Sequence, residues 1–177
     1  TPSLPLRPLS AVEGIMTTDT FFKIHHSSFI IHNSKITIWG CAKGAGMIHP
    51  DMATMLSFIL TDVSIAKTLL KDALKTAVDK SFNRVSVDGD TSTNDCVFLL
   101  ANGEAKNQRI VRKDRNFFLF QEKLDSVCLK LAKMVVSDGE GATKIAVINI
   151  KNAPDEKSAR LIAGTIATSP LVKTALF

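Results

Sequence analysis

Two stretches of the chain repeat apolar residues every three or four positions, and this spacing is the strongest constraint on its fold. They cover residues 65–82 and roughly 116–136. Such a repeat places apolar side chains on one face of a helix, which must then pack against another layer. Apolar runs at residues 35–39, 56–60 and 96–101 are typical of strands, and the last, CVFLLA, is expected to be fully buried. Helices that alternate with strands, some joined by short turns, predict an α+β fold rather than a doubly wound parallel sheet.

Weaker signals complete the expected secondary structure. Three prolines in residues 1–10 suggest a linker or a cut end, and the polar segment at residues 61–64 offers capping side chains for the first helix. We expect further short strands at residues 85–87 and 144–150, and a third helix at about residues 155–168. With 177 residues, the chain is long enough to bury one core.

The basic composition raises the question of a nucleic-acid partner. The net charge is +5 and the pI is near 9.2, but most lysines lie along the expected helices among acidic residues. One region is densely basic and contains Lys106, Arg109, Arg112, Lys113 and Arg115. Asp114 interrupts this cluster, so a solvated hairpin beside a helix start explains it better than a nucleic-acid site. A positive surface equally attracts small anionic substrates, and we expect no nucleic-acid partner.

Cysteine usage and hydropathy bear on the compartment. Cys41, Cys96 and Cys128 are odd in number and form no CxxC pair, which fits reduced thiols in a cytoplasm. No apolar run reaches the roughly 18 residues that a membrane span needs, and the proline-broken start lacks a signal-peptide core. We therefore expect a cytoplasmic location and no membrane partner.

The sequence favours no metal site. Residues 88–95 place three carboxylates in eight residues, but the calcium-loop register and its closing glutamate are absent. A hydrogen-bonded turn between two strands is the preferred interpretation of this segment. His25, His26 and His32 have no cysteine or acidic ligands at zinc-site spacing, so we expect them in strand and loop positions.

The stretch from Lys43 to Leu60, KGAGMIHPDMATMLSFIL, has the most distinctive local chemistry. Its two glycines allow a ligand to approach the backbone closely, and Pro50 fixes a dihedral angle shortly before the Ala53-Thr54 pair. A small residue followed by threonine, between a rigid turn and a strand, suits a site of backbone strain and chemistry. On these residues alone, a loop that enters a strand is the commoner explanation.

Two other polar segments allow similar alternatives. Thr17 lies in MTTDT, whose hydroxyl and carboxylate groups can orient a polar ligand or satisfy the backbone of a turn. Glu140 lies between two glycines in DGEGATK, without the spacing of a phosphate-binding loop. That leaves a carboxylate presented on a turn before the expected strand at residues 144–150.

Three segments together resemble one family. KGAGMIHPDMATML, VDGDTSTND and SDGEGATK are similar to motifs of the ornithine acetyltransferases (bifunctional glutamate N-acetyltransferases) of arginine biosynthesis. The resemblance runs from about Ala11 to Phe177, and it implies stacked β-sheets flanked by helices. This is the α+β fold of a self-processing N-terminal-threonine acetyltransferase, expected here to be incomplete at both ends. Residues 1–53 would be the C-terminal part of the family's α-chain region, and residues 54–177 the N-terminal part of its β-chain region.

The resemblance also implies a reaction. Family members cut themselves at an Ala-Thr pair, which is Ala53-Thr54 here. The new α-amino group, with a pKa of about 7.7–8.0, can accept the proton of the Thr54 hydroxyl. Thr54 would then take the acetyl group of N-acetylornithine and pass it to glutamate in a ping-pong exchange.

The substrate-binding positions of the family fall on Thr17, Lys43, Thr54 and Glu140. From their charges we expect Lys43 to pair with a substrate carboxylate and Glu140 with an amino group. The resemblance implies no cofactor and no metal, and it leaves open whether acetyl-CoA is a second acetyl donor. It further implies that the cleaved α and β chains assemble as a heterotetramer.

Two other functions remain open at the level of sequence. An N-terminal-nucleophile amidase or aminopeptidase of similar architecture would hydrolyse its acyl group instead of transferring it. A non-catalytic basic module would bind nucleic acid through Arg109, Arg112 and Arg115. The chain also departs from the family pattern at Asp51, where asparagine is expected, and at Phe22, where proline is expected. The family's Thr-Gly oxyanion pair belongs upstream of this sequence.

Overall fold

The computed structural model describes residues 7–46, 48, 55–89 and 95–176. The elements in chain order are α1 (Arg7–Ile15), β1 (Lys23–Ile31), β2 (Ser34–Lys43), β3 (Leu56–Thr61), α2 (Lys67–Lys80), the 3-10 turn η1 (Phe82–Arg84), β4 (Cys96–Ala101), α3 (Arg115–Ser137), α4 (Glu156–Thr168) and α5 (Pro170–Leu176). The α+β class is confirmed, as are the three expected helices and the strands expected at residues 35–39, 56–60 and 96–101.

The four strands form one mixed sheet in the order β1-β2-β3-β4. β2 is antiparallel to both of its neighbours, whereas β3 and β4 are parallel. A two-residue turn joins β1 to β2, and its residues His32 and Asn33 have positive φ angles of 45° and 63°. A type I′ hairpin turn requires this backbone, and asparagine adopts it at low cost. The turn sets the register in which Lys23, the first residue of β1, pairs with Ala42.

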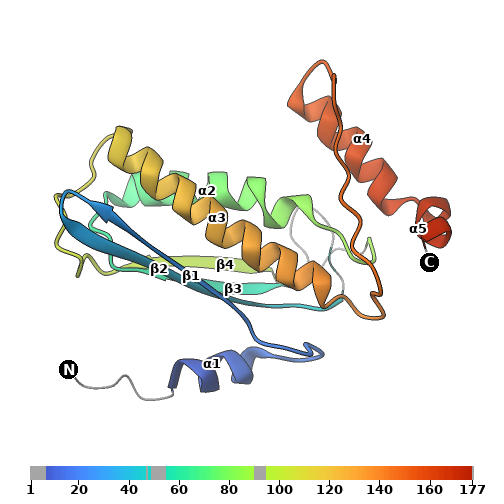
Figure 1. Ribbon diagram of the computed structural model, residues 1–177, viewed down its shortest axis with the longest axis horizontal. Coiled ribbons are helices and arrows are strands. Elements are labelled where there is room, and N and C mark those ends of the chain that lie inside the picture. The colour runs from blue at the N-terminus through green and yellow to red at the C-terminus, as the bar shows by residue number, and fades with distance from the viewer. Residues whose placement is uncertain (1–6, 47, 49–54, 90–94, 177) are drawn as a thin grey trace.

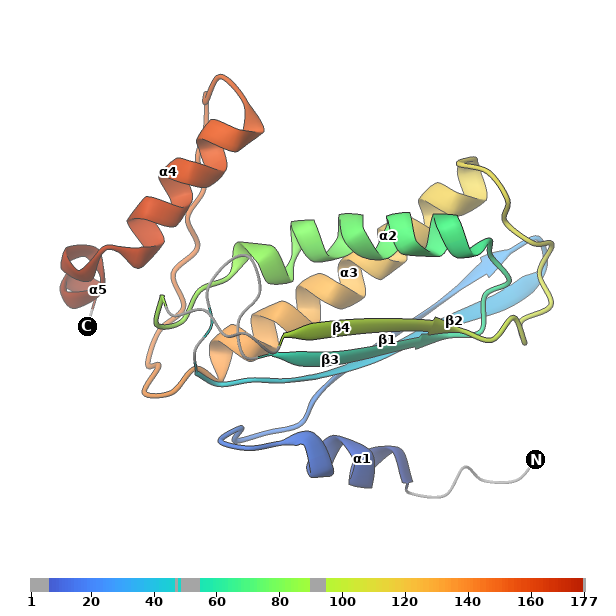
Figure 2. The same cartoon turned by 180° about the vertical axis from the view of Figure 1, so that it is seen from behind.

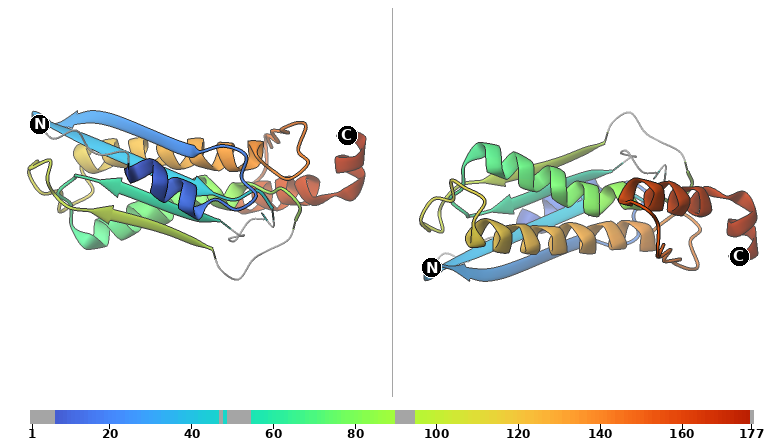
Figure 3. Two further views of the ribbon diagram at one scale, coloured as in Figure 1. Left: turned by 90° about the horizontal axis from the view of Figure 1, so that it is seen from below. Right: turned by 90° about the horizontal axis from the view of Figure 1, so that it is seen from above.

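Two helices, α2 and α3, lie side by side across one face of the sheet (Figure 1, Figure 3). The apolar stripe of α3 is buried against the strands and consists of Phe117, Phe120, Leu124, Val127, Leu131 and Val135. Gly40 of β2 lets α3 approach closely, because a Cβ there would lie 2.9 Å from Leu131 Cδ1. The core therefore lies between these two helices and the sheet.

The opposite face of the sheet also carries apolar side chains, and these are only partly covered. Phe58 and Phe98 stack with ring centroids 5.3 Å apart, while Leu60 and Leu100 are 44% and 54% exposed. Helix α1 lies on this side of the sheet (Figure 2) and buries Val12. Such a face suits packing against a second layer, as in the stacked sheets that the resemblance implies.

The strands expected at residues 85–87 and 144–150 are wrong. The first segment is extended at Val85, but it pairs with none of the described strands. Val87 N instead donates to Ile48 O at 2.7 Å. The second is irregular, with Ile145 and Val147 54% and 75% exposed. An apolar alternation becomes a strand only where a neighbour accepts its hydrogen bonds, and no described strand pairs with this segment.

Three smaller expectations are wrong in whole or in part. The run CVFLLA forms β4, but β4 is an edge strand with Phe98 45% exposed, so it is not fully buried. Helix α1 begins at Arg7, so residues 7–10 of the segment expected to be a linker or a cut end are helical, while residues 1–6 lie outside the described residues. The N-cap of α2 is Ala66, whose side chain makes no capping bond, because Asp62 Oδ1 instead accepts from Thr37 N at 2.8 Å.

The C-terminal helices α4 and α5 lie beyond the end of the sheet (Figure 1). Neither helix has a buried residue. Polar contacts tie them to the rest: Arg84 pairs with Glu156 at 2.6 Å, and Lys173 Nζ donates to Val87 O at 2.8 Å.

Candidate functional site

The candidate site lies where β2 ends and β3 begins. Lys43, the last residue of β2, pairs with Leu56, the first residue of β3. Ala53 and Thr54 lie outside the described residues, but the sequence places Thr54 directly before Met55 and two residues before Leu56. Lys43 therefore lies opposite the first residue of β3, which follows Thr54 by two positions in the sequence.

Thr17 and Lys43 are in direct contact. Lys43 Nζ donates a hydrogen bond to Thr17 Oγ1 at 3.3 Å. Thr17 is exposed in the loop between α1 and β1, while Lys43 is half-buried. A hydroxyl and an ammonium group thus share one small region of the surface, where they can bind a carboxylate together.

Glu140 reaches the same loop from the far end of α3. Its backbone N donates to Ala45 O at 2.7 Å. Its exposed carboxylate lies against Gly46, where a Cβ would come within 3.1 Å of Glu140 Oε2. The structure therefore places Thr17, Lys43 and Glu140 around the short segment 43–46.

A buried ionic cluster, Asp19 with Lys23 and Asp138, lies beneath these residues. Lys23 Nζ donates to Asp19 Oδ1 at 2.5 Å and also to Asp138 Oδ2. The side chains of these three residues are at most 3% exposed. The sequence motifs do not predict this cluster, although one sequence signal points to the burial of Lys23. Because Phe29 and Ile31 face the core, the two-residue period of β1 also places Lys23 on the buried face.

Burial alone would raise the pKa of both carboxyl groups in this cluster. For Asp19, the Lys23 ammonium and the N–H groups of Gly44 and Thr17 outweigh burial, and the pKa lies below its ordinary value of 3.8. The pKa of Asp138 is lowered in the same way, because the Lys23 ammonium and the hydroxyl and N–H groups of Thr20 outweigh burial. Both groups are therefore ionised at neutral pH.

A fall in stability at acid pH is expected from these lowered pKa values. A carboxyl group with a lowered folded-state pKa stabilises the fold above its unfolded value, and that contribution disappears as the pH falls through the folded value. The loss should therefore begin below about pH 5 and deepen below pH 3.8. Asp138→Asn should lower the free energy of unfolding at pH 7 by about 1–3 kcal/mol and flatten this acid branch. Urea unfolding between pH 3 and pH 7 measures both effects.

The exposed Glu104 offers a matched control for this measurement. Glu104→Gln should leave the acid branch unchanged. An Asp138→Asn variant that retained the parent's full pH dependence would contradict the account of the cluster.

Asp88 and Asp95, the two ends of the acidic segment at residues 88–95, both contact the candidate site. Asp88 Oδ1 accepts from Ile48 N at 2.9 Å, and Asp95 Oδ1 accepts from Met55 N. The other carboxylate oxygen of Asp95 is buried and has no hydrogen-bond partner among the residues that the structure describes. Burial raises the pKa of Asp95, against the opposing effects of the Met55 N–H and the Lys43 charge. The two aspartates thus hold the chain on either side of the Ala53-Thr54 pair, a role that sequence analysis did not predict.

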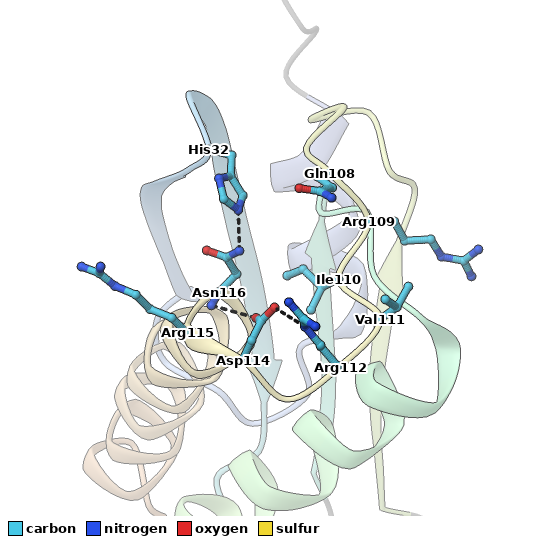
Figure 4. Close-up of a pocket in the computed structure, with 9 residues that line it drawn as sticks. All are labelled: His32, Gln108, Arg109, Ile110, Val111, Arg112, Asp114, Arg115 and Asn116. Atoms are coloured by element: carbon cyan, nitrogen blue, oxygen red, sulfur yellow. Dashed lines mark hydrogen bonds and ion pairs between the residues drawn. The ribbon is translucent and has the colours of Figure 1, made fainter.

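The basic cluster lies at the other end of β2, away from Lys43. A hollow of about 560 Å³ there is lined by His32, Arg109, Arg112, Asp114, Arg115 and Asn116, among others. Asn116 contacts His32 at 2.7 Å, and Arg109 and Arg115 point outward on opposite sides (Figure 4). The start of α3 is confirmed here, but the expected hairpin is wrong, because residues 102–114 form an irregular connection.

The part of the chain that the structure describes holds no group of three or more His, Cys, Asp or Glu side chains suited to a metal ion. Among the same residues, no helix combines the length and the apolar character needed to cross a membrane.

Comparison with known proteins identifies relatives of this chain. Residues 3–177 match the ArgJ family. The "Arginine biosynthesis bifunctional protein ArgJ" of Thermotoga neapolitana is 52% identical over 170 residues, which is 96% of this chain and 43% of that protein. The Neurospora crassa protein of the same name, designated mitochondrial, is 51% identical over 172 residues, or 96% of this chain and 37% of its own length. The chain therefore spans about two fifths of the length of these curated relatives.

A solved structure shares the fold. The crystal structure of the arginine biosynthesis bifunctional protein ArgJ from Bacillus halodurans has a TM-score of 0.67 and 41% identity, and the match covers 70% of this chain and 58% of that one. Similarity of sequence extends over nearly the whole chain, and similarity of structure over most of it. On both grounds, the chain belongs to the ArgJ family.

Proposed function

We propose that this chain forms part of an acetyltransferase that moves an acetyl group from N-acetylornithine to glutamate through acetyl-Thr54, after self-cleavage at Ala53-Thr54. One observation carries the proposal: Lys43 hydrogen-bonds Thr17 at 3.3 Å and pairs with Leu56 at the start of β3. The loop that follows Lys43 binds the backbone of Glu140. The candidate substrate residues thus lie around the segment 43–46, and the first residue of that segment pairs with the start of β3.

The proposed chemistry starts from the weak acidity of a threonine hydroxyl, which needs a base. Cleavage of the Ala53-Thr54 bond gives Thr54 an α-amino group that accepts the hydroxyl proton as Oγ attacks the acetyl carbonyl. Collapse of the tetrahedral intermediate breaks the amide bond, protonates the leaving nitrogen and releases ornithine. The amino group of glutamate then attacks the acetyl ester, which forms N-acetylglutamate and restores the Thr54 hydroxyl.

The other groups position the substrates. The Lys43 ammonium pairs with the α-carboxylate, the Thr17 hydroxyl supports that contact, and the Glu140 carboxylate pairs with a substrate amino group. Asp95 holds Met55 N and so orients the chain next to Thr54. No cofactor takes part in these steps, and acetyl-CoA is a proposed second acetyl donor.

The proposal assigns residues 1–53 to the α-chain region and residues 54–177 to the β-chain region, which assemble as a heterotetramer after cleavage. Oxyanion donors and further substrate contacts come from the rest of the natural protein. Cys41, Cys96 and Cys128 are free thiols, which supports a reducing compartment, and we propose the cytoplasm. Because fungal relatives are designated mitochondrial, cell fractionation tests this location.

The fate of the acetyl group tests the proposed reaction. The protein is expressed at its natural length and incubated with glutamate and with N-acetylornithine labelled in its acetyl group. Mass spectrometry should find the label in N-acetylglutamate. It should find free acetate forming at least about 10²-fold more slowly, since the bound amine, and not water, must be the favoured nucleophile. A label found mainly in free acetate would instead identify an N-terminal-nucleophile amidase.

A further inference from the structure

Lys23 carries a buried charge that takes part in none of the proposed reaction steps. Of the lysines in the described part of the chain, it alone is buried, with a side chain 0% exposed. A buried ion pair is costly to desolvate, and apolar residues of similar volume often stabilise a fold as well or better. The contacts of its two partners indicate what the charge does instead.

Asp19 connects Lys23 to two candidate substrate residues. Its Oδ2 accepts from the backbone N of Thr17 at 3.1 Å, and its Oδ1 accepts from the backbone N of Gly44, next to Lys43, at 2.8 Å. A single carboxylate thus sets the backbone positions from which the Thr17 hydroxyl and the Lys43 ammonium extend.

Asp138 connects Lys23 to the third candidate substrate residue, Glu140. It is the C-cap of α3 and lies two residues before Glu140. Its Oδ2 accepts from Thr20 N at 2.9 Å, and its Oδ1 accepts from the hydroxyl of Thr20. The loop after α1, the end of β2 and the end of α3 therefore meet at the Lys23 ammonium.

We propose that Lys23 is a positioning residue for the amino-acid substrates: by holding Asp19 against Asp138, it sets the distances among Thr17, Lys43 and Glu140. This inference rests on the proposed acetyl transfer and extends it to a residue beneath the site. Thr17, Lys43 and Glu140 lie on separate segments of the chain. The Lys23 ammonium joins the two carboxylates that hold these segments. It therefore also fixes the spacing between the proposed carboxylate-binding pair and the proposed amine-binding glutamate.

Lys23→Met tests the proposal in the protein at its natural length. Methionine fills most of the same volume but leaves two facing carboxylates without a cation. The KM values for N-acetylornithine and for glutamate should rise about 10–100-fold, the range typical when an outer residue that orients ligand-contacting groups is replaced. The value of kcat should change much less, and intact mass should still show cleavage at Ala53-Thr54, because Thr54 keeps its own chemistry.

A second variant separates positioning from folding. The triple variant Asp19→Asn, Lys23→Met, Asp138→Asn removes every charge of the cluster, so no buried charge is left unpaired to destabilise the fold. Its KM values should stay raised even where its unfolding midpoint returns to that of the parent. The matched control is Lys80→Met, which removes a surface pair with Asp125 that is 2.8 Å long, and it should leave both KM values unchanged.

The outcomes are distinct. KM values equal to the parent's in either folded cluster variant would overturn the positioning role and leave the proposed function intact. Failure of both variants to fold would assign the cluster a purely structural role and would also overturn the inference. A parent protein that transfers no acetyl group would instead contradict the proposed function itself.

Discussion

Replacement of Thr54 by alanine is expected to leave a single uncut chain and to lower acetyl transfer by at least about 10⁴-fold. In the proposed mechanism the variant loses both the hydroxyl that attacks and the α-amino group that cleavage would create. Removal of a nucleophile from an acyl-transfer site lowers the rate by this much or more. Intact mass of the protein at its natural length measures cleavage, and the labelled-acetyl assay measures transfer. The parent should give two fragments that meet between Ala53 and Thr54.

Two further threonine variants complete this test. Thr54→Ser keeps a hydroxyl at the same position, so it should still cleave and transfer, though more slowly. Thr68→Ala, at an exposed position of α2, should behave as the parent does. Transfer that persisted in Thr54→Ala, or one uncut chain in the parent as well, would refute Thr54 as the nucleophile.

The second large effect is expected in the core. Phe120 lies on the buried face of α3 and is 0% exposed. Phe120→Ala removes a whole ring from between α3 and the sheet, so it should lower the free energy of unfolding by about 3–5 kcal/mol through lost burial and the cavity left behind. Urea unfolding followed by circular dichroism measures the change.

Phe118 is the matched control on the same helix. Its side chain is 58% exposed, so Phe118→Ala should change the free energy of unfolding by less than about 1 kcal/mol. Equal losses in the two variants would show that α3 does not carry the core packing described above.

Sequence patterns predict the elements of this fold whose determining interactions are local. The apolar repeat at residues 116–136 predicts α3 closely, because a helix forms its hydrogen bonds within the same segment. The runs at residues 35–39 and 56–60 also became strands. Burial of a strand depends on its place in the sheet, and that is why CVFLLA at residues 96–101 became a half-exposed edge strand.

Local sequence patterns do not predict the contacts within the candidate site. The motifs placed Thr17, Lys43 and Glu140 at positions that the structure brings together. Nothing in the sequence pairs Lys23 with Asp138, since the two residues are 115 positions apart and neither lies in a spacing pattern that reveals a partner. The same holds for Asp95, which reaches Met55 because parallel pairing of β3 and β4 brings the starts of both strands to one edge.

The Thr20–Asp138 contact has a consequence for the order of folding. Its two residues are 118 positions apart, so forming this contact early would close a long loop at a large cost in chain entropy. Contacts of such separation form late compared with the β1-β2 hairpin, whose turn has only two residues. During synthesis, a nascent chain that ends before residue 138 lacks the partner that holds Thr20 and Lys23 in place. The hairpin is therefore expected to form first, and the geometry of the candidate site only after the whole of α3 has been made and has docked on the sheet.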